Sequence, residues 1–160
     1  MAASRHAHYP APFGPITVVG YGRRLERLYL NREELSAEYG PPKPAALVKV
    51  FEQLAAYFAG TRRGFDLQLV PQGTPYQCRV WAGLSAIPYG ETRSYGRLAE
   101  SLDPPSVARA VGQANGANPI AIVVPCHRVI GARGGMVGFG GGLAIKRWLL
   151  AHEAGQATLI

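Results

Sequence analysis

The spacing of hydrophobic and polar positions in the first half of the chain predicts a small sheet and one helix. Apolar and polar residues alternate on both sides of a glycine-containing turn within residues 15–30, which is typical of two paired strands. Residues 65–70 alternate again and predict a further strand. Residues 36–44 are rich in proline and polar groups and predict a loop. Apolar residues recur at helical spacing from residue 45 to 58, namely Leu47, Val50, Phe51, Leu54 and Phe58.

The second half of the chain predicts three short helices. Thr74 followed by Pro75 is a typical helix start, and the next helix begins at a capping Ser94 and runs to Leu102. Asp103-Pro104-Pro105 forces a turn before a third helix over residues 106–114. A helix, a tight turn and a second helix make the arrangement of many DNA-binding domains, although structural helical hairpins share it.

Residues 118–130 carry the most reactive chemistry and read Asn-Pro-Ile-Ala-Ile-Val-Val-Pro-Cys-His-Arg-Val-Ile. Their β-branched centre, residues 120–124, predicts a buried extended segment that places Cys126 and His127. A cysteine is nucleophilic only as thiolate, and its free pKa of about 8.5 means that it needs a nearby base. His127 is the candidate base, through a water or a bend, because adjacent side chains on an extended segment point to opposite faces. Ordinary packing of both residues is the alternative.

Composition limits the class of protein. A chain of 160 residues with 48% hydrophobic content is globular and buries one core or two small ones. No segment has the length of a signal peptide's apolar region or of a membrane span, so we expect a soluble, cytoplasmic protein without a membrane partner. Two cysteines without a Cys-x-x-Cys pair predict no disulfide framework and no bound metal. We expect Cys78 to be buried, and His6 and His8 to lie in a solvated tail.

The net charge of +7 permits a polyanionic partner without requiring one. The excess is even along the chain, because the first 80 residues hold ten basic and six acidic side chains and the last 80 hold seven and four. The third helix is more informative. It sets Ala108, Ala110 and Gly112 around one long cation, Arg109, and such small residues permit close approach to a minor groove. The alternative is that the alanines pack in the core and Arg109 is an ordinary surface charge.

The motif Asn-Pro, a short apolar run and Pro-Cys-His-Arg-Val resembles the active-site signature of the O6-alkylguanine-DNA alkyltransferases, the methylated-DNA–protein-cysteine methyltransferases, and most closely their bacterial members. The resemblance extends over residues 74–155, through 87–95, 108–114, 138–142 and 148–153. It implies an α/β (α+β) protein with a small RNase H-like N-terminal domain, residues 1–70. A mainly helical, winged helix-turn-helix domain, residues 71–160, follows.

The resemblance also implies the catalytic residues. Cys126 is the nucleophile that accepts the alkyl group as a thioether, and His127 takes the thiol proton through a water. Glu153 orients the imidazole and stabilises its charge. Asn118 holds the turns around the site. Tyr95 contacts the backbone near the flipped nucleotide and donates a proton towards guanine as it leaves.

The same resemblance implies that the third helix enters the minor groove and that Arg109 replaces a nucleotide swung out of the duplex. The residues expected to contact DNA are Ser94, Tyr95, Ala108, Arg109, Ala110, Gly112 and Arg128. Those expected to form the substrate pocket are Val129, Phe139, Gly140, Gly141 and Lys146. Phe139 stands where the family often has tyrosine, and Gly140 where serine or alanine is frequent, so the preferred alkyl group stays open.

The function implied is direct, irreversible, single-turnover repair of double-stranded DNA containing O6-alkylguanine, with no cofactor, no metal and no obligate protein partner. Three alternatives stay open. A non-catalytic damage sensor of the same family has its cysteine replaced, whereas Cys126 is present here. A cysteine hydrolase would turn over repeatedly, and a helix-turn-helix regulator would prefer one DNA sequence and survive loss of the cysteine.

Overall fold

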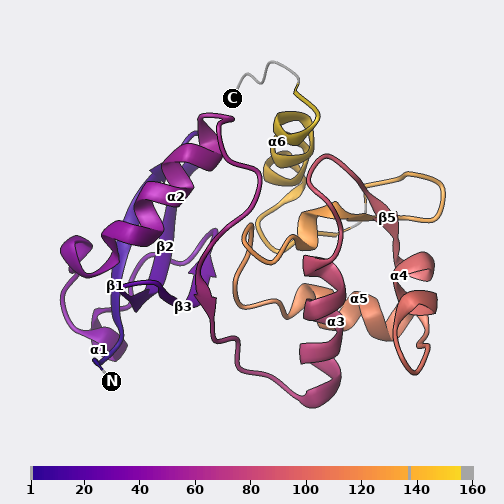
Figure 1. Ribbon diagram of the computed structural model, residues 1–160, viewed down its shortest axis with the longest axis horizontal. Coiled ribbons are helices and arrows are strands. Elements are labelled where there is room, and N and C mark those ends of the chain that lie inside the picture. Colours follow the sequence, from indigo (N-terminus) through magenta and orange to yellow (C-terminus); the bar gives the residue numbers. More distant parts are fainter. Residues whose placement is uncertain (1, 137, 156–160) are drawn as a thin grey trace. The chain divides into compact units, whose positions relative to one another are not determined.

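A computed structural model describes residues 2–136 and 138–155 (Figure 1). The chain divides into two compact units, one formed by residues up to Pro71 and the other beginning at Gln72. The first unit contains a four-stranded sheet and the second is mainly helical, so the predicted mixed α/β class is confirmed. None of the helices in the described part of the chain is long and apolar enough to cross a bilayer.

The sheet of the first unit has the strand order β1-β2-β3-β4. Its strands are β1 (Arg5–Ala11), β2 (Gly14–Tyr21), β3 (Arg24–Tyr29) and β4 (Gln68–Leu69). The first three pair antiparallel, and β4 pairs parallel to β3. The predicted hairpin within residues 15–30 is confirmed as β2 and β3. The strand predicted over residues 65–70 is present only as the short β4.

The prediction that His6 and His8 lie in a solvated tail is wrong, because both residues lie in β1. The strand pairs with β2 over its whole length, from Arg5 opposite Gly20 to Ala11 opposite Gly14. His6 is fully buried, and the ring of His8 lies 3.0 Å from the Thr17 hydroxyl, measured from Nδ1 to Oγ1. Pairing with β2 satisfies the backbone hydrogen bonds of this segment. Its composition, rich in small residues and histidine, does not reveal this pairing.

The helical part of the first unit comprises α1 (Ser36–Tyr39), a 3₁₀ turn η1 (Pro44–Leu47) and α2 (Val48–Phe58). The predicted helix over residues 45–58 is therefore a 3₁₀ turn that continues into α2, and the predicted loop contains the short α1. Of the predicted apolar stripe, Leu47, Val50 and Leu54 are buried, whereas Phe51 and Phe58 are half-buried. Gln53 ties α2 to the segment before β4, because its amide donates to the Asp66 carbonyl (2.9 Å) and accepts from the Asp66 backbone N–H (2.8 Å).

The described residues of the second unit form four helices, two short paired strands and a 3₁₀ turn. They are α3 (Pro75–Ser85), β5 (Arg93–Ser94), α4 (Tyr95–Ser101), α5 (Ala108–Gly116), η2 (Cys126–Arg128), β6 (Val129–Ile130) and α6 (Leu143–Glu153). Local chemistry fixes the predicted starts of the first two helices. Thr74 and Gln77 form a reciprocal capping box, and the Ser94 hydroxyl accepts from the Arg97 N–H (3.1 Å).

The helices α3, α4 and α5 pack on one another and hold the rest of this unit in place. The buried face of α3 is formed by Val80, Trp81 and Leu84, and the Trp81 indole donates to the Ala114 carbonyl of α5 (2.8 Å). Cys78 lies on the other side of α3 and is exposed, so its predicted burial is wrong. The register of the helix decides this, because residue 78 is more than 100° around the axis from the centre of the buried face.

Candidate active site

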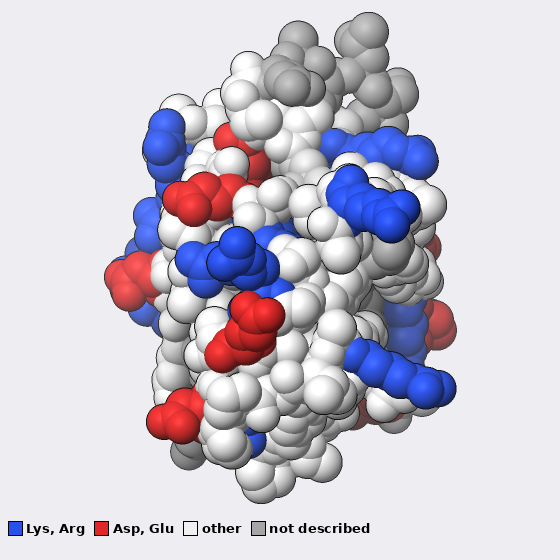
Figure 2. All heavy atoms as spheres, turned by 90° about the vertical axis from the view of Figure 1, so that its right-hand side faces the viewer, with Lys and Arg blue, Asp and Glu red and all other residues white. Residues whose placement is uncertain are grey.

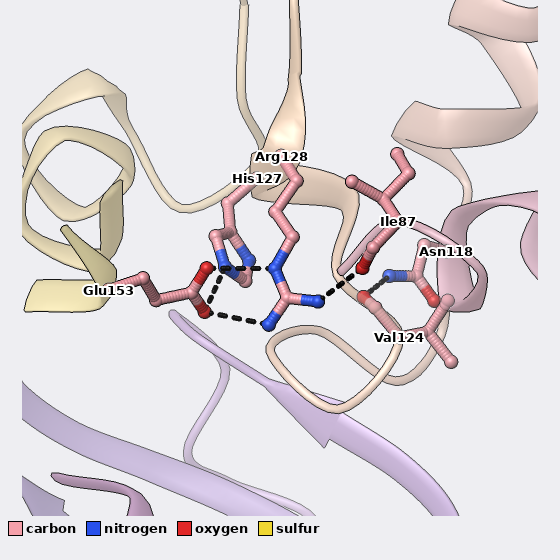
Figure 3. Close-up of polar contacts among 6 residues, drawn as sticks. All are labelled: Ile87, Asn118, Val124, His127, Arg128 and Glu153. Carbon is pink, nitrogen blue, oxygen red and sulfur yellow. Dashed lines mark hydrogen bonds and ion pairs between the residues drawn. The ribbon is translucent and has the colours of Figure 1, made fainter. Parts of the chain in front are cut away.

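The segment that leads to Cys126 is buried, as predicted, but it is a set of turns and not an extended strand. Ile122 has a positive φ of 72°, and the Val124 N–H donates to the Ile120 carbonyl (3.0 Å). The Asn118 side chain closes the segment, because its Nδ2 donates to the Val124 carbonyl (2.8 Å; Figure 3) and its Oδ1 accepts from the Ile120 N–H (3.0 Å). A side chain that bonds nearby backbone in this way competes with strand formation. Hydropathy alone therefore mispredicts the segment.

Cys126 begins the 3₁₀ turn η2 and is only 5% exposed. Burial raises the pKa of its thiol above the ordinary value, because a thiolate loses solvation there. The Asn118 side chain and the positive charge of Lys146 oppose this rise. At neutral pH the resting residue is therefore a thiol, and a nucleophilic reaction needs a base to remove its proton.

His127 is the base that the site offers. Its Nε2 lies 2.8 Å from Glu153 Oε2, and both side chains are buried (Figure 3). A carboxylate only accepts, so a neutral imidazole carries its hydrogen on Nε2 and leaves Nδ1 with a lone pair. Nδ1 is buried and has no hydrogen-bond partner among the described residues. Burial lowers the pKa of His127 below its ordinary 6.5, against the opposing pull of Glu153, so the ring is neutral at pH 7.

Arg128 shares the Glu153 carboxylate with His127. Its Nε and Nη2 donate to the two carboxylate oxygens at 2.7 and 3.0 Å, and its Nη1 donates to the Ile87 carbonyl at 2.7 Å (Figure 3). The side chain is buried and all three of its nitrogens are engaged. The guanidinium therefore joins α6 to η2, and the DNA-binding role expected for Arg128 stays a prediction.

Two of the predicted pocket residues, Val129 and Phe139, lie beside the buried Lys146. Lys146 of α6 donates from Nζ to the Val129 carbonyl (2.7 Å), and Nζ lies 6.0 Å from the centre of the Phe139 ring. Burial lowers the pKa of Lys146, and the negative charge that Cys126 carries when ionised opposes this fall. Of the two glycines, Gly140 is exposed and Gly141 is half-buried. The structure thus brings Val129, Phe139 and Lys146 together, with the thiol in electrostatic reach of the ammonium.

Tyr95 is the first residue of α4 and lies close enough to Cys126 for their charges to interact. The pKa of its phenol is raised by burial and, second, by the negative charge of an ionised Cys126. Gly112 of α5 lies under the ring, because a Cβ at that position would stand 3.7 Å from Tyr95 Cδ1 and Cε1. The structure therefore places Gly112 against Tyr95.

The other residues predicted to contact DNA lie at the surface of the second unit. Ala108 and Arg109 are exposed at the start of α5, and Ala110 is half-buried. A shallow pocket of about 410 Å³ surrounds Ser94 and is lined by Thr92, Arg93, Ser94, Arg97 and Ser101. Basic and acidic side chains alternate on the face drawn in Figure 2. Positive charge therefore does not form one broad patch in that view.

Two participants in the site were missed in the sequence. Asn115 lies on the buried side of α5, one turn after Val111, and its Nδ2 is 3.5 Å from the Cys126 carbonyl oxygen. A polar residue at a buried helical position is the signal that would have found it. Ile87 takes part through its backbone carbonyl alone, which no side-chain pattern reveals.

Two models of one family of DNA methyltransferases match the fold and the site described above. The model of the 6-O-methylguanine DNA methyltransferase ribonuclease-like domain matches residues 5–71, and that of the same family's DNA-binding domain matches residues 75–155. The chain belongs to the 6-O-methylguanine DNA methyltransferase family.

Individual relatives agree over nearly the whole chain. The methylated-DNA–protein-cysteine methyltransferase of Mycobacterium tuberculosis is 50% identical, over 92% of this chain and 90% of that protein. The protein of the same name from Methanosarcina acetivorans is 44% identical, over 92% of this chain and 97% of that one. The crystal structure of Mycobacterium tuberculosis OGT in complex with DNA has a TM-score of 0.88 and 48% identity, covering 96% of this chain and 94% of that one.

The burial of Cys126 and the exposure of Cys78 predict unequal alkylation by iodoacetamide. At pH 7.5 we expect Cys78 to react at least about tenfold faster, because Cys126 is buried and its pKa is raised. Peptide mapping by mass spectrometry over time measures both rates, and Cys78→Ser provides the control in which only Cys126 is left to react. Equal rates at the two cysteines in the folded protein would contradict the environment described for Cys126.

The buried Arg128 predicts a loss of stability on substitution and no loss of phosphate contacts. Arg128→Leu leaves Glu153 without its guanidinium partner, and we expect the free energy of unfolding to fall by about 3–5 kcal/mol. Arg97→Leu, at the exposed pocket, should change stability by less than about 0.5 kcal/mol. It should instead reduce the slope of log binding constant for DNA against log salt concentration by about 1. Urea unfolding and DNA titrations at several salt concentrations measure both quantities, and the reverse assignment of effects would contradict a structural role for Arg128.

Proposed function

We propose that this protein repairs DNA by transferring the alkyl group of O6-alkylguanine in duplex DNA to the thiol of Cys126. The observation that carries the proposal is a buried cysteine beside a neutral histidine that is held by a buried glutamate. Membership of the 6-O-methylguanine DNA methyltransferase family, with half of the residues identical to a methylated-DNA–protein-cysteine methyltransferase, supports the same activity.

The transfer is one displacement at the alkyl carbon. Nδ1 of His127 accepts the Cys126 proton through a water, and the sulfur lone pair forms the bond to carbon. The carbon–oxygen bond breaks, and its electron pair stays on the guanine. Tyr95 donates a proton towards the leaving base, which makes guanine the better leaving group. The products are guanine in DNA and a thioether that this site has no means to hydrolyse, so each molecule reacts once.

The charged residues around the thiol favour the thiolate that the reaction needs. Glu153 keeps the hydrogen of His127 on Nε2 and stabilises the imidazolium once the proton is taken. Lys146 and the Asn118 side chain both lower the pKa of Cys126 relative to burial alone. Asn118 also holds the turn that ends at Val124, so that Cys126 is presented in one position. We assign no step to a metal or an organic cofactor.

Double-stranded DNA carrying the lesion is the partner. The start of α5 provides the small exposed surface that a minor groove of about 6 Å accepts, with Ala108 and Ala110 beside Arg109. Arg109 fills the space of the damaged nucleotide as the base swings out of the stack. Ser94 and Tyr95 contact the backbone of the damaged strand, and the flipped base lies against Val129, Phe139, Gly140, Gly141 and Lys146.

We further propose that the two units act as separate domains, residues 1–70 and 71–160, with catalysis and DNA binding in the second. Every residue assigned a role above belongs to the unit that begins at Gln72. The reducing interior of a cell keeps Cys126 as a thiol and contains the DNA substrate. We therefore propose a cytoplasmic location.

The direct test is the intact mass of the protein after incubation with duplex DNA that contains one O6-methylguanine. We expect a stoichiometric gain of one methyl group, mapped to Cys126, and none in Cys126→Ser. Cys78→Ser should gain the group as the unaltered protein does, because Cys78 lies outside the site. Tight binding without an adduct would point to a damage sensor. Absence of both adduct and lesion preference would favour a hydrolase or a regulator of transcription.

The proposed role of Arg109 predicts that its loss slows transfer from duplex DNA but not from a free base. Arg109→Ala should slow transfer from O6-methylguanine in duplex DNA by about tenfold or more, because unstacking the nucleotide then lacks a side chain to take its place. Reaction with the free base O6-benzylguanine should change by less than about twofold. Arg147→Ala removes an exposed arginine of α6 and serves as the charge control. Equal losses on the two substrates in Arg109→Ala would refute the assignment.

A further inference from the structure

The helix α5, which carries Arg109, begins without a side-chain cap. Its N-cap residue is Val107, whose side chain has no group that accepts a hydrogen bond, and no side chain of the described residues takes over this role. The two helices before it begin differently, because a side-chain oxygen of Thr74 or Ser94 accepts a backbone N–H in the first turn. A helix of only nine residues frays at an uncapped end. The position of Arg109, the second residue of α5, therefore depends on contacts from elsewhere in the chain.

The segment that leads into α5 is tied to α3 by two side chains. The hydroxyl oxygens of Tyr76 and Ser106 lie 2.7 Å apart and share one hydrogen bond. Arg79 of α3 donates from Nη2 to the Pro104 carbonyl (2.7 Å), and its guanidinium carbon lies 5.5 Å from the centre of the Tyr76 ring. The backbone N–H of Ser106 also donates to the Ala99 carbonyl of α4 (2.9 Å). The residue before the N-cap of α5 is thus held from two helices.

The helix α3 is a firm support for these contacts. Its apolar face is buried in the second unit, and its start is closed by the capping box of Thr74 and Gln77. Near the other end of α5, the Trp81 indole donates to the Ala114 carbonyl (2.8 Å). The helix α3 therefore holds α5 at both ends, and it also contacts the 3₁₀ turn that carries Cys126. One helix thus links the position of α5 to that of the thiol.

We propose that Tyr76 and Arg79 are positioning residues that hold the uncapped start of α5, so that Arg109 meets the duplex in one fixed place relative to the thiol. This inference rests on the transferase activity and on the role of Arg109 proposed above. A side chain that replaces a nucleotide must enter the stack while the damaged base reaches Cys126, so a misplaced α5 slows transfer. Tyr76 and Arg79 act through α5 and are assigned no part in the chemical step.

The test compares single-turnover transfer from O6-methylguanine in duplex DNA with the reaction of the free base O6-benzylguanine. Tyr76→Phe removes only the hydroxyl, and Ser106→Ala removes the partner of that hydroxyl. We expect each change to slow transfer from the duplex about threefold to tenfold, which is the range that one hydrogen bond contributes. The reaction with the free base should keep the rate of the unaltered protein, because it needs no extrusion. The double variant should be no slower than either single variant, because both changes remove the same bond.

Matched variants separate positioning from a general loss of stability. Ser106→Thr keeps the hydroxyl and should restore the duplex rate that Ser106→Ala loses. Tyr29→Phe removes a tyrosine hydroxyl that accepts a hydrogen bond within the first unit, and it should leave both rates unchanged. Arg79→Met should slow duplex transfer further when it is added to Tyr76→Phe. Arg62→Met, which removes an arginine that donates to a backbone carbonyl of the first unit, should add nothing to Tyr76→Phe.

The outcomes separate this inference from the proposed function. Equal slowing of the duplex and free-base reactions in Tyr76→Phe would mean that the hydroxyl has a structural role only, and the inference would be wrong. An unchanged duplex rate in both Tyr76→Phe and Ser106→Ala would overturn it as well. If Tyr76→Phe does not fold, the duplex rates of Ser106→Ala and Ser106→Thr decide. No transfer from either substrate by the unaltered protein would refute the proposed function, and this inference with it.

Discussion

The buried carboxylate of Glu153 is the constraint on which the rest of the site depends. It ends α6 and accepts hydrogen bonds from both His127 and Arg128 of η2. Arg128 supplies the compensating charge, since a carboxylate facing only the imidazole would draw a proton onto it and leave no base. Both the guanidinium and burial lower the pKa of His127, whereas Glu153 raises it. Burial is the main cause that keeps His127 neutral, and the positive charge of Arg128 adds to it, so that Nδ1 is available to a proton.

The same burial protects a residue that can be used only once. Cys126 is almost inaccessible, and its raised pKa keeps it as a thiol, which reacts slowly with the oxidants and electrophiles of a cell. The groups that promote the thiolate, Lys146 and Asn118, are already in place around it. A damaged base that enters the site would meet a nucleophile that is prepared but not yet ionised. The buried surroundings of Cys126 therefore account both for the low reactivity of the resting thiol and for its activation when a damaged base is bound.

Prediction from sequence succeeded where the determinants are local. Thr74 and Ser94 cap helices through bonds to residues three positions away, and the family motif around Cys126 fixed the class of protein. Prediction failed where the local structure depends on a residue that is distant in the sequence. Pairing with β2 makes a strand of the expected tail at His6, and the bonds of Asn118 turn an apolar run into a loop. The Glu153 partner of Arg128 lies 25 residues away, so no local pattern reveals that this charge is buried.

The state of the His127 ring tests the account most directly. Nitrogen-15 NMR of the protein labelled at its four histidines, with His127→Gln to assign the signal, reports the charge and tautomer of each ring. At pH 7.5 we expect a neutral imidazole with its hydrogen on Nε2 and a bare Nδ1. The Arg128→Leu variant, where it remains folded, should shift the ring towards the doubly protonated form. An imidazolium, or a hydrogen on Nδ1, in the unaltered protein would contradict the proposal that Glu153 and Arg128 together hold His127 as the base for Cys126.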